Sequence, residues 1–206
     1  MLRLYWADVS RLSPDADEYE LSAYRREKLR TLRPPDARKL SIGAELLLRH
    51  ALFDCAPEIT WPPVITAGEH GKPDWNVEGP YFNLSHSGHI AACVIADRPV
   101  GLDVQKACEY REALARRFFS AAEQAFLAAS ADKDRAFGLV WSRKEAYVKA
   151  LGTGFTIPHA SFSAVGEQTP ENDAFWDAVL GAYTFAICLP GARSAEPDVI
   201  IEKQLP

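Results

Sequence analysis

The chain has 206 residues, enough for one large domain or two small ones, and its 48% hydrophobic and 25% charged residues are typical of a folded globular protein. The net charge of −5 argues against nucleic acid as a partner, because proteins that bind nucleic acid usually present a basic surface. No apolar run approaches the roughly 20 residues that cross a bilayer, and the first ten residues turn polar too early for a signal peptide. We therefore expect a cytoplasmic protein with neither a nucleic acid nor a membrane as its partner.

The first part of the chain predicts a strand followed by two helices. Residues 2–9 are rich in strand formers. Residues 13–15, Ser-Pro-Asp, are a helix start, with a capping serine followed by proline at the first helical position. A stronger helix is predicted over residues 34–55, where leucine and alanine recur at helical spacing. Many Pro and Gly residues then predict loops with short extended pieces over residues 56–80.

Three short strands are predicted in the middle of the chain, over residues 81–84, 90–96 and 100–104. The Asp-Arg-Pro sequence at 97–99 is a plausible turn between the last two. Short strands with tight connections predict an antiparallel meander.

The last part of the chain predicts helices and then strands. Residues 111–129 are helical, with Ser120 as an internal cap before Glu123, and a longer helix over residues 135–151 stops at Gly152. The remaining segments are strand-like at 156–164, 175–180 and 182–189, followed by a polar, loosely held tail.

These elements predict an α+β fold of two halves, residues 1–98 and 99–206. Each half would be an antiparallel sheet packed with helices. No flexible linker separates the halves, so we expect them to pack closely, with a cleft at their boundary.

The helix at 135–151 carries charges on its apolar side. Lys144 falls within the face formed by its large apolar residues, and Glu145 and Lys149 flank that face. Charges at such positions are costly unless they are paired or face a cleft. Taken alone, the helix is better explained by a Glu–Lys pair one turn apart and a lysine that extends to solvent.

Two further segments combine strand formers with reactive side chains. Residues 83–89, Asn-Leu-Ser-His-Ser-Gly-His, could offer hydroxyl, imidazole and backbone N–H groups to a phosphate, or could be an ordinary polar turn. In Gly101-Leu102-Asp103-Val104-Gln105, Asp103 and Gln105 share one face of a strand. Asp103 could bind a metal there, or face water from an edge strand.

Taken in order, four segments resemble the surfactin-type 4′-phosphopantetheinyl transferases. The family pattern contains GKP, then a strand ending in an asparagine–apolar–SHS stretch, then G-[IL]-D-[VI]-E and W-x-x-K-E-[AS]-x-x-K. This chain has Gly71-Lys72-Pro73, then residues 82–87 as FNLSHS, residues 101–105 as GLDVQ and residues 141–149 as WSRKEAYVK. Single motifs are weak, but the ordered set is specific and covers roughly residues 25–163.

The resemblance implies a pseudo-twofold pair of similar α+β halves in a monomer, with coenzyme A bound between them. It implies transfer of the 4′-phosphopantetheine group of coenzyme A to a serine of an apo acyl or peptidyl carrier protein, with Mg²⁺ and release of 3′,5′-ADP. The carrier could come from peptide-synthetase, polyketide, siderophore or fatty-acid systems. The residues that it implies for coenzyme A are Arg25, Lys28, Lys72, Pro73, Ser85, His86, Lys144 and Lys149.

The implied metal and catalytic set is smaller. Asp103 and Glu145 would hold Mg²⁺, Glu145 would accept the serine proton, and Lys149 would neutralise the leaving phosphate. Many family members have a second acid where this chain has Gln105, so we expect Gln105 to contact the ion weakly or through water.

Two other readings are open on the sequence. One is a non-catalytic module that binds coenzyme A or a carrier, which Glu145 and Lys149 argue against. The other is a hydrolase that uses Ser85 and His86, which strand alternation and the absence of a GxSxG elbow disfavour. The basic residues that crowd positions 25–39 could also dock an acidic carrier.

Overall fold

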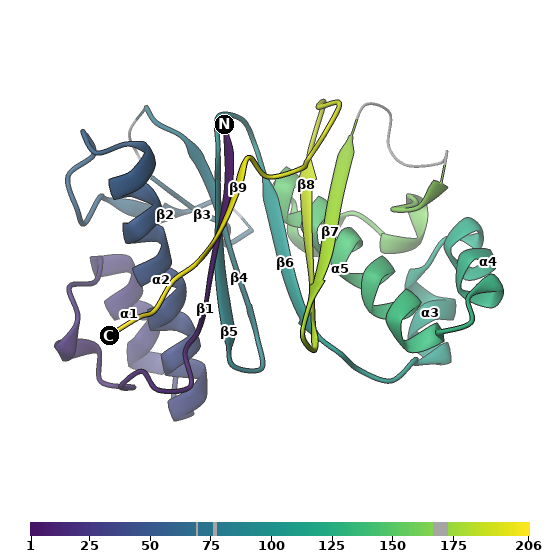
Figure 1. Ribbon diagram of the computed structural model, residues 1–206, viewed down its shortest axis with the longest axis horizontal. Helices are drawn as coiled ribbons and strands as arrows, with labels where there is room; N and C mark the ends of the chain where they lie inside the picture. Colours follow the sequence, from purple (N-terminus) through teal and green to yellow (C-terminus); the bar gives the residue numbers. More distant parts are fainter. Residues whose placement is uncertain (69, 76–77, 167–172) are drawn as a thin grey trace. The chain divides into compact units, whose positions relative to one another are not determined.

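The computed structural model describes residues 1–68, 70–75, 78–166 and 173–206. The chain forms two compact units (Figure 1). Unit 1 comprises Met1–Pro99 together with Pro197–Pro206, and unit 2 comprises Val100–Glu196. Each unit combines a sheet with packed helices, which confirms the predicted α+β class. None of the helices in the described ranges is both long and apolar enough to cross a membrane.

Unit 1 is built on a four-stranded sheet with the order β4-β5-β1-β9, which α2 covers on one face. A separate two-stranded sheet pairs β2 with β3. The elements are β1 (Leu2–Asp8), the short 3-10 turn η1 (Ala16–Glu18), α1 (Ala23–Thr31), α2 (Pro35–Cys55), β2 (Ile65–Ala67), β3 (Pro73–Trp75), β4 (Tyr81–Ser87), β5 (Ile90–Ala96) and β9 (Val199–Glu202).

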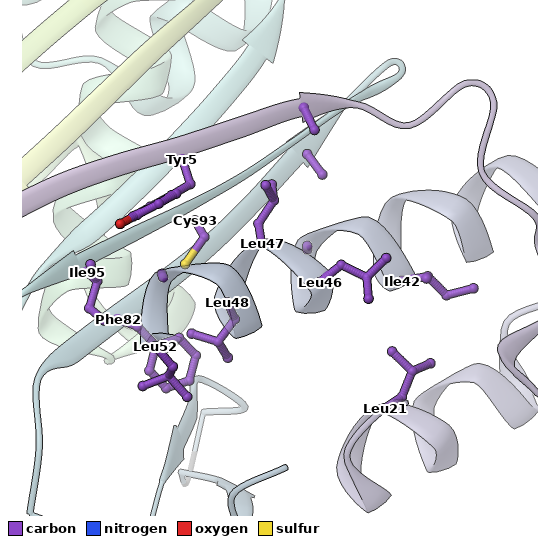
Figure 2. Close-up of a cluster of buried hydrophobic side chains, with 14 of the residues drawn as sticks. Tyr5, Leu21, Ile42, Leu46, Leu47, Leu48, Leu52, Phe82, Cys93 and Ile95 are labelled. Atoms are coloured by element: carbon purple, nitrogen blue, oxygen red, sulfur yellow. The ribbon is translucent and has the colours of Figure 1, made fainter. Parts of the chain in front are cut away.

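The core of unit 1 follows from the helical spacing of α2. Proline at the start of α2 suits its first turn, where the backbone N–H would have no helical partner. The leucines of α2 then meet alternate residues of β1, β4 and β5, because side chains two apart on a strand share a face. Figure 2 shows this contact, with Leu47, Leu48 and Leu52 of α2 beside Tyr5, Phe82, Cys93 and Ile95.

The C-terminal segment belongs to unit 1, so its predicted place in the second half is wrong. β9 pairs in parallel with β1, and the N–H of Leu2 donates to Asp198 Oδ2 at 2.8 Å. The Lys203 N–H donates to the carbonyl of Trp6 at 2.9 Å. These bonds hold the tail that the sequence predicted to be loose, and they make the unit 1 sheet mixed rather than wholly antiparallel.

Unit 2 is a three-stranded antiparallel sheet with the order β6-β8-β7, and α5 packs along it. The predicted helices at its start are confirmed, including the capping box in which Ser120 and Glu123 bond each other's backbone N–H. The elements are β6 (Gly101–Lys106), α3 (Glu112–Phe118), α4 (Ala121–Ala129), α5 (Lys133–Leu151), the 3-10 turns η2 (Gly154–Thr156) and η3 (His159–Ser161), β7 (Ala174–Leu180) and β8 (Tyr183–Leu189).

Three local predictions fail. The meander is wrong, because β6 pairs with β8 rather than with β5. Residues 156–164 form 3-10 turns instead of a strand. The helix predicted from residue 13 is only the turn η1, capped by Asp15, whereas α1 starts after Ser22, whose side chain accepts from the Arg25 N–H. Parts of the predicted loop at 56–80, residues 69 and 76–77, lie outside the described residues.

Gly101 lets β6 and α5 approach closely. A Cβ added at this position would lie 3.0 Å from the carbonyl carbon of Ala146, and nearer still to its oxygen and to the backbone nitrogen of Ala150. Ala186 and Cys188 of β8 meet the same two alanines. The small residues at this contact therefore bring the strand that carries Asp103 against the helix that carries Glu145 and Lys149.

Candidate active site

The centre of the candidate site is an ion pair between β6 and α5. Asp103 is on the α5 side of β6, since it shares that face with Gly101 and stands opposite Ala186. Its Oδ1 accepts a hydrogen bond from Lys149 Nζ at 2.6 Å. The Asp103 side chain is 9% exposed and that of Lys149 is 30% exposed. The pair is therefore shielded on the strand side and open to a ligand on the lysine side.

Glu145 lies one helical turn before Lys149 on α5. Residues four apart on a helix face are neighbours, with Cβ atoms about 5–6 Å apart. Asp103, Lys149 and Glu145 thus form a short row of alternating charge. Of the residues predicted to do chemistry, Asp103 and Lys149 are in direct contact, and Glu145 lies one helical turn from Lys149.

His159 completes this row, although no pattern in the sequence predicted a functional role for it. Its Nε2 lies 3.2 Å from Glu145 Oε1. The histidine side chain is 4% exposed and the glutamate 17% exposed. The residue was overlooked because the segment around it was predicted to be a strand. The only signal in the sequence was the preceding proline, which favours a turn.

Lys144 points the other way, into the core of unit 2. Its ammonium donates to both carboxylate oxygens of Glu123, at 2.8 and 2.7 Å, and to the carbonyl of Phe162 at 2.8 Å. Both charged side chains are fully buried. Burial lowers the pKa of Lys144, and Glu123 opposes that effect. The prediction that Lys144 binds coenzyme A is therefore corrected, because three hydrogen bonds within unit 2 use the three ammonium hydrogens.

Gln105 follows Asp103 on the same face of β6. Its amide nitrogen donates to the carbonyl of Lys106 at 3.1 Å. A pocket of about 200 Å³ opens beside it, lined by Gln105, Cys108, Arg111, Leu114, Phe137 and Trp141. The amide thus lies at a mostly apolar hollow, where the family pattern has a carboxylate.

The oxygen donors present suit Mg²⁺. Within the described ranges, no three His, Cys, Asp or Glu side chains gather in a metal-binding group. Asp103 and Glu145 supply two carboxylates, and Mg²⁺ usually takes one or two of them with substrate phosphates and waters. The donor set therefore fits a magnesium ion that binds together with a phosphate ligand.

In unit 1, the basic stretch is largely used by the fold. Arg25 is 7% exposed, and its guanidinium donates to Glu45 Oε2 and Ser41 Oγ, both at 2.9 Å. Arg38 donates to backbone carbonyls, including that of Leu29 at 2.6 Å. We therefore assign Arg25 a structural role in place of the predicted phosphate contact. Lys28 is exposed, with its ammonium over the ring of Tyr24, and stays a candidate for an anionic ligand.

Lys72 lies at the turn between β2 and β3. Gly71 takes a positive φ of 81° there, and the carbonyl of Lys72 accepts from the Gly68 N–H at 2.9 Å. Pro73 pairs with Ala67 in the two-stranded sheet. Burial lowers the pKa of Lys72, and nearby Asp74 opposes the shift. A partly desolvated lysine at a turn gains more from a bound phosphate than a fully solvated one.

Ser85 and His86 project to opposite faces of β4. His86 is exposed and stands opposite Ala91, on the face that α2 covers, whereas Ser85 is buried and stands opposite Ala92. The structure therefore does not bring the two side chains together. This geometry also disfavours a Ser–His hydrolase pair.

Comparison with known proteins identifies the family. The model of the 4′-phosphopantetheinyl transferase superfamily matches residues 99–186, which include Asp103, Glu145, Lys149 and His159. The 4′-phosphopantetheinyl transferase AcpT of Salmonella typhimurium is 31% identical over 174 residues, which cover 81% of this chain and 85% of that protein. The chain belongs to the 4′-phosphopantetheinyl transferase superfamily.

Other members of the superfamily match over shorter lengths. The transferase gsp of Aneurinibacillus migulanus is 33% identical over 63% of this chain and 55% of its own length. The transferase Sfp of Bacillus subtilis is 38% identical over 46% and 44%. The chain thus spans about half the length of these two relatives. The solved holo-[acyl-carrier-protein] synthase of Thermotoga maritima shares 18% identity over 46% of this chain and 64% of its own, at a TM-score of 0.37, too distant to support a conclusion.

Proposed function

We propose that this protein transfers the 4′-phosphopantetheine group from coenzyme A to a serine hydroxyl of an apo acyl or peptidyl carrier protein. The observation that carries the proposal is the row of Asp103, Lys149 and Glu145. It lies within the segment that matches the superfamily, and two of its members, Glu145 and Lys149, lie one turn apart on α5. A module that only bound coenzyme A would not need a carboxylate beside a lysine at the phosphate.

The proposed reaction is a displacement at phosphorus. The carrier serine oxygen attacks the β-phosphorus of coenzyme A, a new O–P bond forms, and the bond to the bridging oxygen breaks to release 3′,5′-ADP. Glu145 accepts the serine proton, and Lys149 neutralises the charge that develops on the leaving phosphate. Because phosphoryl transfer depends mainly on position and charge, these groups act chiefly through their placement.

Asp103 and Glu145 are the residues that would hold Mg²⁺. When bound, this ion would neutralise charge on the pyrophosphate oxygens. Asp103 also holds the ammonium of Lys149 at 2.6 Å, so this lysine keeps a defined position before any ligand arrives. Lys28, Lys72, Pro73, Ser85 and His86 of unit 1 are proposed contacts for the nucleotide end of coenzyme A.

The test is a mass assay on intact carrier proteins. The protein is mixed with coenzyme A, Mg²⁺ and a panel of apo carriers from peptide-synthetase, polyketide, siderophore and fatty-acid systems. We expect at least one carrier to gain one phosphopantetheine group and the gain to stop with a chelator. Glu145→Gln should lose about 10²–10⁴-fold in rate while it still binds coenzyme A. The exposed Glu109 provides the matched control, Glu109→Gln, which should stay active.

Two results would overturn the proposal. One is the absence of any mass gain across the panel, which would favour a binding module. The other is a Glu145→Gln variant as active as the wild type, which would remove this residue from the chemistry. Transfer that persists with a chelator would instead refute the requirement for Mg²⁺.

A further inference from the structure

The buried imidazole of His159 lies next to Glu145 and takes no direct part in the proposed reaction. His159 is 5% exposed, yet its Nε2 lies 3.2 Å from Glu145 Oε1. The tautomer that fits this contact carries its proton on Nε2 and donates to the carboxylate oxygen, since a carboxylate without a proton offers only acceptors. A buried polar group needs such a partner, since leaving it unpaired costs free energy.

Aromatic rings fix the orientation of this imidazole. Trp141 stacks on His159 with centroids 6.3 Å apart and an interplanar angle of 24°. Phe118 meets it edge-on at 5.9 Å and 74°, and Phe162 lies at 6.3 Å. Since the ring is packed on several sides, its nitrogen cannot follow Glu145 if the carboxylate moves.

The segment that carries His159 is itself anchored on both α4 and α5. Glu123 Oε1 accepts from the Ala164 N–H at 2.7 Å, while Lys144 donates to the carbonyl of Phe162 at 2.8 Å. Two consecutive residues of α5 therefore hold the same segment. The Lys144 side chain bonds the backbone carbonyl of Phe162, and the Glu145 side chain meets the imidazole of His159. This arrangement fixes the position of the backbone segment that carries the imidazole.

We propose that His159 is a positioning residue, whose Nε2–H holds Oε1 of Glu145 so that this carboxylate is presented in one orientation for Mg²⁺ and the carrier serine. The inference rests on the proposed function, and it adds a residue that acts through Glu145 rather than on the substrate. The physical gain is preorganisation, because the carboxylate does not have to lose rotamer freedom when the ligand binds.

Two substitutions separate the hydrogen bond from ring packing. His159→Leu removes the donor, whereas His159→Gln replaces the ring and keeps an N–H at a similar distance from the backbone. We expect the Kd for Mg²⁺, measured by calorimetry with coenzyme A and without carrier, to rise about 10–100-fold in His159→Leu. His159→Gln should recover most of that loss. The KM for Mg²⁺ in the transfer assay should follow the same order.

A substitution in the same turn provides the control. Ser161 Oγ donates to the carbonyl of Pro158 at 2.7 Å and is exposed, so Ser161→Ala perturbs η3 without touching Glu145. Ser161→Ala should bind Mg²⁺ as the wild type does, with thermal unfolding measured on every variant. If His159→Leu unfolds, His159→Phe takes its place, because phenylalanine keeps an aromatic ring and removes the donor.

The outcomes distinguish this inference from the proposed function. Active wild type with equal Mg²⁺ affinity in all variants would overturn the role of His159 and leave the transferase function intact. Equal loss in His159→Leu and His159→Gln would show that ring packing, and not the hydrogen bond, matters. A wild type that neither transfers the group nor binds Mg²⁺ would overturn both proposals.

Discussion

Gly101→Ala should push β6 away from α5 and so move Asp103 of the candidate site away from Lys149. The added Cβ would lie 3.0 Å from the Ala146 carbonyl carbon and closer to two other backbone atoms, whereas an ordinary contact is 3.4–4 Å. Backbone atoms cannot swing aside as a side chain can, so the strand or the helix must move. Overpacking typically costs about 1–3 kcal/mol, and this site should lie at the upper end.

The consequence can be measured as stability and as activity. A loss of about 3 kcal/mol corresponds to a fall of about 6–12 °C in Tm, at about 2–4 °C for each kcal/mol in a chain of this size. Circular dichroism melting measures that fall. The movement should also lengthen the 2.6 Å bond between Lys149 and Asp103, so transfer should fall even at temperatures where the variant is folded.

Gly138→Ala provides the matched control on α5. Here the added Cβ would find its nearest neighbour, Thr184 Oγ1, at 3.9 Å, so there is room. Alanine favours a helix over glycine by up to about 1 kcal/mol, and Tm should stay level or rise. A Gly101→Ala variant that melts with the wild type, or a Gly138→Ala variant that is the less stable of the two, would refute the argument from close approach.

Three further outcomes are expected. Lys144→Met leaves the carboxylate of Glu123 buried without its main partner and should cost about 3–5 kcal/mol in urea unfolding; a cost below 1 kcal/mol would show that the pair is not structural. Burial lowers the pKa of Lys72 from 10.5 and a bound phosphate would raise it again, so coenzyme A affinity should fall as pH rises through the lowered pKa. Calorimetry at several pH values should show a flatter dependence in Lys72→Met, and an unchanged profile would exclude Lys72 from the phosphate contacts. Gln105→Glu restores an acid next to Asp103 and should tighten Mg²⁺ binding several-fold in calorimetry; weaker binding would place the side chain away from the ion.

Elements with local signals were predicted well from the sequence. The proline at the start of α2, the capping box of Ser120 and Glu123, and Gly152 at a φ of 69° after α5 all act within one turn of the element that they bound. Helical boundaries of this kind depend on hydrogen bonds between residues three or four apart, which a sequence displays directly.

Elements whose place depends on distant partners were predicted poorly. β6 was expected beside β5 because they are neighbours in sequence, yet it pairs with β8, and β9 returns to β1 across almost the whole chain. Apolar alternation shows that a strand has a buried face, but it does not say which strand lies next to it. The role of Lys144 failed for the same reason, since its partner Glu123 lies 21 residues away.

The sequence alone determined the helices with local caps, the α+β class, and the spacing that puts Glu145 and Lys149 one turn apart. Only the tertiary structure decided which charges are available to a ligand. Two lysines five residues apart on α5 differ in their access to a ligand. Lys144 is buried against a buried glutamate, whereas Lys149 is partly exposed and pairs with Asp103 on the edge strand of the sheet. The physical reason is that helical periodicity sets the direction of a side chain, whereas the charge and burial of its surroundings come from residues far away in the chain.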